Sequence, residues 1–99
     1  MKIKMDLIVR VKEIKGRCPV YKVGDEFKIQ NGWILRTEFP ICMHSLASIM
    51  PYYNALKVLK GGELGLNRNR GEKTAYVQCL DPYEYTDGGT VIFEISIID

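Results

Sequence analysis

The pattern of apolar and polar positions predicts one strand near each end of the chain. Over residues 3 to 11, apolar side chains alternate with polar or charged ones, and Ile8 is the one exception. The same alternation returns near the other end, in Val91, Phe93, Ile95 and Ile97. Alternation with a period of two is typical of a half-buried strand. Both segments are therefore expected to be strands with one face on the core.

Two segments between these strands also have β character. Residues 27 to 35 contain Asn31-Gly32, a pair that takes positive φ at both central positions of a type I′ turn, so a hairpin is expected. Residues 74 to 79 are rich in β-forming side chains. That strand should end before Pro82, because proline lacks the N–H that a strand ladder needs.

The apolar period changes to a helical one after Met43. The inward positions of this segment are expected to be Leu46, Ile49 or Met50, Tyr53, Leu56 and Leu59. Pro51 interrupts the pattern, which predicts two short helices or one kinked helix, with the second part beginning near Pro51. Gly61-Gly62 is interpreted as the C-terminal stop.

These elements predict an α+β fold of a single domain over residues 1–99. The expected architecture is a small antiparallel sheet of about four strands, in the order β-β-α-β-β with an Asn-Gly hairpin. The sheet packs on one face against the short, Pro-interrupted helical segment. A chain of 99 residues has the usual size of one domain, and no linker or repeat divides it.

Composition and charge narrow the class of protein. No apolar run approaches the ~18 residues that span a bilayer, and the first residues alternate charged with apolar side chains, unlike a signal peptide. The three cysteines are odd in number and far apart, which argues against a secreted disulfide framework. We therefore expect a cytoplasmic protein with no membrane partner. A net charge of +2 is too small to indicate a nucleic-acid partner.

The cysteines are the candidate chemistry of the chain. Cys18, Cys42 and Cys79 all fall at the edges of predicted elements, with His44 close to the second of them. If the four converge, they form a Cys₃His metal site suited to zinc or iron. The chain has no C-x₂-C pair, the usual mark of a zinc site. Spacing alone therefore favours the plainer alternative of three structural cysteines, because free cysteine is often buried.

No enzyme motif is present in the sequence. The chain lacks a P-loop, G-x-G-x-x-G, G-x-S-x-G and H-E-x-x-H. A catalytic pair of Cys42 and His44 is disfavoured, because residues two apart on a helix do not face one another. Catalytic residues, any small-molecule ligand and the question of enzymatic activity are therefore left open.

Two surfaces offer alternatives without catalysis. The exposed face of the sheet and Trp33 could bury against a second copy, giving an oligomerisation module that is a homodimer. Arg68, Arg70 and Lys73, with Tyr76 and Trp33, could form a basic surface with stacking aromatics for single-stranded RNA. Three basic residues make a small electrostatic footprint, so nucleic acid is the weaker of the two alternatives.

Several short motifs, taken in order, resemble one family of short, uncharacterised prokaryotic proteins. Members of that family run K-G-x-C, G-H-K-V-G-D-x-F, G-x-C, a helical L-x-P stretch, G-G, C-P-D and a closing V-F-E-I strand. The matching positions here are 15–18, 22–27, 41–42, 46, 51, 55–56, 61–62, 79–81 and 91–95. The resemblance implies that all three cysteines occupy motif positions, which raises the case for a shared site; it implies no activity. Tyr21 stands where the family has histidine, and Leu80 where it has proline.

Overall fold

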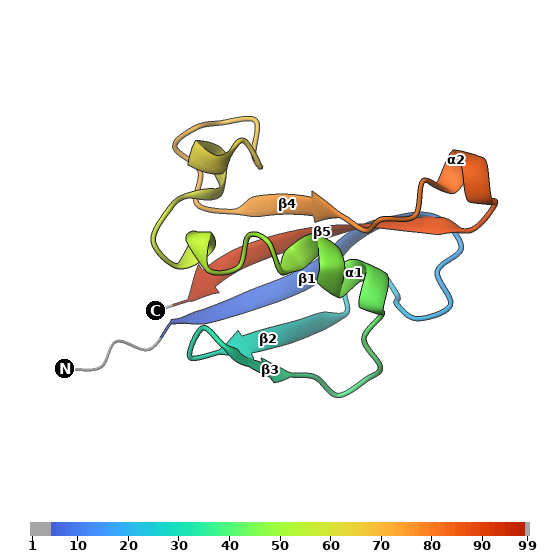
Figure 1. The fold of residues 1–99 in the computed structure, drawn as a ribbon, viewed down its shortest axis with the longest axis horizontal. Coiled ribbons are helices and arrows are strands. Elements are labelled where there is room, and N and C mark those ends of the chain that lie inside the picture. The colour runs from blue at the N-terminus through green and yellow to red at the C-terminus, as the bar shows by residue number, and fades with distance from the viewer. Residues whose placement is uncertain (1–4, 99) are drawn as a thin grey trace.

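A computed structural model describes residues 5–98, which form a five-stranded antiparallel sheet with short helical segments (Figure 1). The strands are β1 (Asp6–Gly16), β2 (Glu26–Gln30), β3 (Ile34–Arg36), β4 (Ala75–Gln78) and β5 (Gly89–Ile98), in the order β3-β2-β1-β5-β4. The α+β class is confirmed, and the sheet has one strand more than the four or so expected, because both arms of the hairpin are strands. The start of the first predicted strand, residues 3 and 4, lies outside the described residues.

The two strands nearest the chain ends form the centre of the sheet. Val9 pairs with Ile95 and Val11 pairs with Phe93, so apolar residues of β1 and β5 lie side by side on one face. The register shifts between Val11 and Glu13. This irregularity breaks the alternation that the sequence shows up to Val11, and β1 continues beyond it to Gly16.

The Asn-Gly hairpin is confirmed. Asn31 and Gly32 have φ of 58° and 86°, and the Trp33 N–H donates to the Gln30 carbonyl at 3.1 Å. Positive φ at both central residues is the geometry of a type I′ turn, which matches the right-handed twist of paired strands. The Asn31 N–H donates to the Asp6 carboxylate at 2.8 Å, so the turn is also attached to β1.

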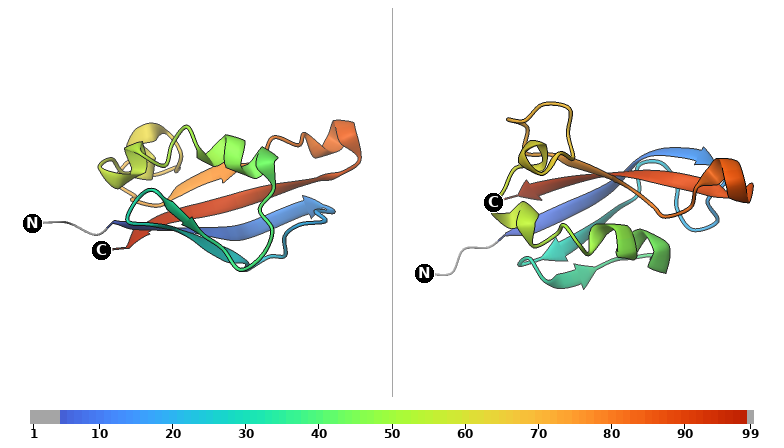
Figure 2. Two further views of the ribbon diagram at one scale, coloured as in Figure 1. Left: turned by 60° about the horizontal axis from the view of Figure 1, so that its bottom comes forward. Right: turned by 45° about the horizontal axis from the view of Figure 1, so that its top comes forward.

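The helical segment lies on one face of the sheet, as both views in Figure 2 show. It consists of α1 (Met43–Ile49) and the 3₁₀ turn η1 (Ala55–Lys57). Pro51 follows the C-cap Met50, and α1 ends there. The segment directly after Pro51 contains the 3₁₀ turn η1 in place of the expected second α-helix. Ile49 is 1% exposed and Met50 is 57% exposed, which decides that Ile49 faces the core. No helix of the described part is long and apolar enough to cross a membrane.

Gly61 and Gly62 do not end a helix, which corrects the interpretation from sequence. Both are buried at the start of a second 3₁₀ turn, η2 (Gly61–Leu64). A Cβ on Gly61 would lie 2.2 Å from the Thr74 carbonyl oxygen, and one on Gly62 would lie 2.1 Å from that of Asn69. The pair is therefore required by the close approach of two backbone segments.

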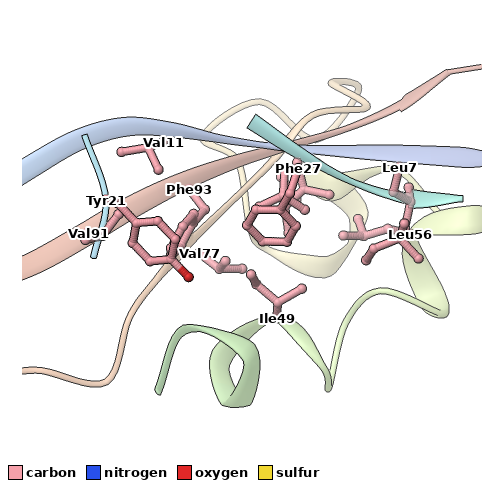
Figure 3. Packing of buried hydrophobic residues seen from close by; sticks show 13 residues of the cluster. Leu7, Val11, Tyr21, Phe27, Ile49, Leu56, Val77, Val91 and Phe93 are labelled. Carbon is pink, nitrogen blue, oxygen red and sulfur yellow. The ribbon is translucent and has the colours of Figure 1, made fainter. Parts of the chain in front are cut away.

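The core lies between the sheet and the helical segment, and aromatic rings occupy its centre (Figure 3). Phe93 is fully buried and meets the ring of Tyr21 edge to face, with centroids 5.5 Å apart. The Phe27 ring meets the Phe93 ring with centroids 6.5 Å apart. Ile49 of α1 and Leu56 of η1 complete the core from the helical side. Edge-to-face pairs are the preferred geometry of aromatic rings, so this cluster holds Tyr21 in place.

Candidate functional site

The structure brings all four predicted site residues to one pocket. Cys18, Cys42, Cys79 and His44 line a pocket of about 220 Å³, which we call the thiol pocket. They come from three separate parts of the chain: the segment after β1, the start of α1 and the end of β4. Other side chains of the lining that matter below are Arg17, Tyr21, Ser45 and Asp81.

Cys18 lies in the segment that leaves β1. The Arg17 N–H donates to the Gly88 carbonyl at 3.1 Å, which extends the contact between β1 and β5 past the end of the strand. The Cys18 sulfur accepts the N–H of Tyr21 at 3.4 Å. The side chain is partly buried and the thiol is free.

Cys42 precedes α1, and its backbone is held on both sides. Its N–H donates to the Tyr21 hydroxyl at 2.9 Å, and its carbonyl accepts the Ser45 hydroxyl at 2.7 Å. His44 lies in the first turn of α1 and is exposed, so it forms part of the rim of the thiol pocket.

Cys79 continues the inward side of β4. Ala75 and Val77 are buried and alternate with exposed Tyr76 and Gln78, and Cys79 follows with the same parity. Its N–H donates to the Val91 carbonyl at 2.9 Å. Its thiol donates to the Gly89 carbonyl at 4.0 Å and lies 3.6 Å from the Thr90 hydroxyl.

Tyr21 and Ser45 are wall residues that the sequence did not single out as a site. Their hydroxyls are 2.6 Å apart and both side chains are buried. Burial raises the pKa of the Tyr21 hydroxyl, and the hydrogen bonds with Ser45 and Cys42 lower it in part. Tyr21 entered the sequence analysis only through the expected family resemblance, at a position where histidine was expected. Ser45 carried no signal of its own.

Asp81 also lines the thiol pocket, from the segment that joins β4 to β5. The segment contains a one-turn helix, α2 (Tyr83–Thr86). The Thr86 hydroxyl donates to one carboxylate oxygen of Asp81, and the Gly89 N–H donates to the other at 3.4 Å. Both oxygens are therefore engaged in holding the turn.

The predicted Cys₃His metal site is not found as a preformed cluster. Among residues 5–98, no three His, Cys, Asp or Glu side chains are placed so that they could hold a metal ion together. The four predicted ligands share a pocket but do not converge on one point. A site for zinc or iron stays a prediction. The bound metal would have to bring the four side chains together.

The residues of the RNA hypothesis separate in the structure. Arg68 and Tyr76 line a wide groove of about 880 Å³ on the other face of the sheet, together with Lys12. Trp33 follows β2, whereas Tyr76 is on β4, at the opposite edge of the sheet. The stacking pair that the hypothesis needs is therefore not assembled.

The chain was compared with protein-family models, with curated proteins and with solved structures, and none of them matches it.

Proposed function

We propose that this domain works through the thiols of the thiol pocket. The observation that carries the proposal is that every cysteine of the chain lines this one pocket, together with the one histidine. Three cysteines that served only as small core side chains would have no reason to gather. The resemblance to the uncharacterised family, in which these cysteines fall on motif positions, supports the same proposal.

The burial of the three cysteines supports a reactive role over a packing role. All three are partly exposed, whereas the core positions around them, such as Phe93 and Val91, are at most 1% exposed. A thiol reacts only when reagents reach it, so partial exposure on a pocket wall is the expected setting. Three free thiols also fit a reducing compartment, and we propose the cytoplasm as the location.

The test is a thiol titration of the native protein with an aromatic disulfide reagent, repeated after unfolding in urea. The proposal expects the pocket thiols to react in the native state, and to be protected from the reagent by a ligand that occupies the pocket. The variants Cys18→Ser, Cys42→Ser and Cys79→Ser assign each phase of the reaction to its thiol. Thiols that stay unreactive until the protein unfolds would return all three to the core and end the proposal.

A second candidate is binding of a soft metal ion in the same pocket, with zinc or iron as the ion. Three sulfurs and an imidazole in one pocket favour it, because thiolate and imidazole are the preferred ligands of these metals. The metal would have to draw the side chains together on binding. Elemental analysis of untagged protein purified without chelator should then show about one metal per chain, lost in each Cys→Ser variant. Metal-free protein that also fails to take up added zinc would exclude this candidate.

A homodimer is proposed as a role outside the thiol pocket. The face of the sheet opposite α1 carries no helix in the described residues, and Trp33 is 72% exposed. Large exposed aromatic side chains are common at protein interfaces. Light scattering over a wide range of concentration should show a dimer mass that Trp33→Ala lowers, with Tyr85→Ala as the exposed control. A monomer mass throughout would contradict it.

A further inference from the structure

We infer that Cys18 is the reactive thiol of the thiol pocket, and that it exchanges with low-molecular-weight disulfides. The inference rests on the proposed function and adds to it the attacking residue and the class of substrate. It follows from the different hydrogen bonds of the cysteine sulfurs and from the charges around them.

The polar contacts of Cys18 and Cys79 differ. A backbone N–H, which can only donate, faces the Cys18 sulfur, whereas Cys79 faces the Gly89 carbonyl and, at 3.6 Å, the Thr90 hydroxyl, which can donate or accept. The Cys18 sulfur accepts a hydrogen bond from the Tyr21 backbone N–H at 3.4 Å. The Cys79 thiol donates to the Gly89 carbonyl at 4.0 Å. A donor that points at a sulfur stabilises negative charge on it, whereas a carbonyl oxygen stabilises the protonated thiol. The thiolate is the nucleophile, so these contacts favour Cys18 over Cys79.

The charges on the wall of the pocket favour the same residue. Arg17, the neighbour of Cys18 in the chain, lines the pocket and carries a positive charge. Asp81, the carboxylate of the lining, has one oxygen engaged by the Thr86 hydroxyl and the other by the Gly89 N–H. Cations in a pocket attract anionic and polar reagents, and Arg17 lines the same pocket as Cys18.

Cys42 differs from both. Its backbone is fixed by Tyr21 and Ser45, but within the described residues no hydrogen bond involves its sulfur. It therefore lacks the donor that Cys18 has.

The proposed step is thiol–disulfide exchange. The Cys18 thiolate attacks one sulfur of a small disulfide, a new S–S bond forms, and the disulfide's own S–S bond breaks. The other half leaves as a thiolate and takes up the proton that Cys18 released. One disulfide is consumed and one is formed, so no further oxidant or reductant is needed. A pocket of about 220 Å³ has room for one arm of such a molecule.

The experiment uses the full chain and bis(2-hydroxyethyl) disulfide as the probe. Samples quenched with acid at early times are analysed by intact mass and by peptide mapping. The expected first product is a mixed disulfide on Cys18. Cys18→Ser should slow the first addition by about tenfold or more. Val58→Ala, a 77% exposed position outside the thiol pocket, should keep the wild-type rate. First modification at Cys42 or Cys79, or an unchanged rate in Cys18→Ser, would overturn the inference.

The mapping in the wild type also covers the case in which Cys18→Ser fails to fold, because it needs no variant. Failure of the inference and failure of the proposed function look different. If only the inference is wrong, the native thiols react but Cys18 is not the first. If the proposed function is wrong, none of the three reacts before the protein unfolds.

Discussion

The Tyr21 hydroxyl lies 2.6 Å from the Ser45 hydroxyl, and both side chains are buried. Ser45 uses its own hydrogen to bond the Cys42 carbonyl, so Tyr21 is the donor of the pair. The Tyr21 hydroxyl accepts the Cys42 N–H in return. This closed set of bonds joins the segment after β1 to the start of α1, and so sets the position of Cys42 relative to Cys18 across the thiol pocket.

Removal of either hydroxyl should therefore destabilise the protein, and the two effects should overlap. Tyr21→Phe and Ser45→Ala are each expected to lower the free energy of unfolding by about 1–2 kcal/mol. The double variant should lose less than the sum, with a coupling of about 1 kcal/mol. Urea unfolding of the four proteins gives the coupling directly. Strict additivity would show that the two hydroxyls do not depend on one another.

The raised pKa of the Tyr21 hydroxyl predicts a loss of stability in base. Because burial favours the neutral hydroxyl, the pKa is higher in the folded than in the unfolded protein, where it is near ~10. Unfolding therefore releases a proton above that pH, and the stabilisation that is complete below it is lost as the pH rises through the folded pKa. Tyr21→Phe should flatten this part of the curve of unfolding free energy against pH between about 9 and 11. Tyr85 is 89% exposed, so Tyr85→Phe should keep the wild-type curve.

Truncation of two adjacent residues at the C-terminal end of α1 should lower the free energy of unfolding by very different amounts. Ile49 is 1% exposed among core side chains, so Ile49→Ala leaves a cavity and should cost about 2–5 kcal/mol. Met50 is 57% exposed, and Met50→Ala should cost less than about 1 kcal/mol. Thermal unfolding followed by circular dichroism measures both. Similar costs for the two would mean that α1 is rotated on the sheet.

Substitution of Gly62 and of Gly71 by alanine should also change the free energy of unfolding by different amounts. A Cβ on Gly62 would lie 2.1 Å from the Asn69 carbonyl oxygen, whereas a Cβ on Gly71 would meet no atom within 4 Å. Gly62→Ala should therefore destabilise by several kcal/mol, about 3 or more, and Gly71→Ala by less than about 1. The two variants are compared by their urea midpoints of unfolding, provided that the dependence of the unfolding free energy on urea is the same in both. A neutral Gly62→Ala would mean that η2 does not pack on this loop.

The sequence predicted what short-range alternation and turn chemistry decide. Val9 and Val11 indicate the inward face of β1, and Asn31-Gly32 indicates the turn between β2 and β3. Both predictions succeed because each pattern lies within a few residues of sequence. The continuation of β1 to Gly16 could not be read, since the irregularity near Glu13 shifts the pattern. The close approach of Gly61 to Thr74 is a contact between segments that are separate in sequence. Because no local pattern shows it, Gly61-Gly62 was interpreted as a helix stop.

The candidate site was predictable only as a list of residues. Cys18, Cys42 and Cys79 could be named from their positions at element edges, but whether they meet depends on how β1, α1 and β4 are placed by the core. Their actual arrangement, one pocket without a preformed metal cluster, depends on Tyr21 packing on Phe93 while its hydroxyl reaches Ser45. No local pattern carries that information.

The place of β5 has a consequence for how the protein is made. β5 lies between β1 and β4, yet of the five strands it is the last to leave the ribosome. Until it arrives, β1 has β2 as its one neighbour, β4 has no partner strand, and Phe93 is missing from the centre of the aromatic cluster. Contacts that distant in sequence form late and slow folding. The thiol pocket is therefore incomplete, and its three cysteines are more accessible, until β5 has been synthesised.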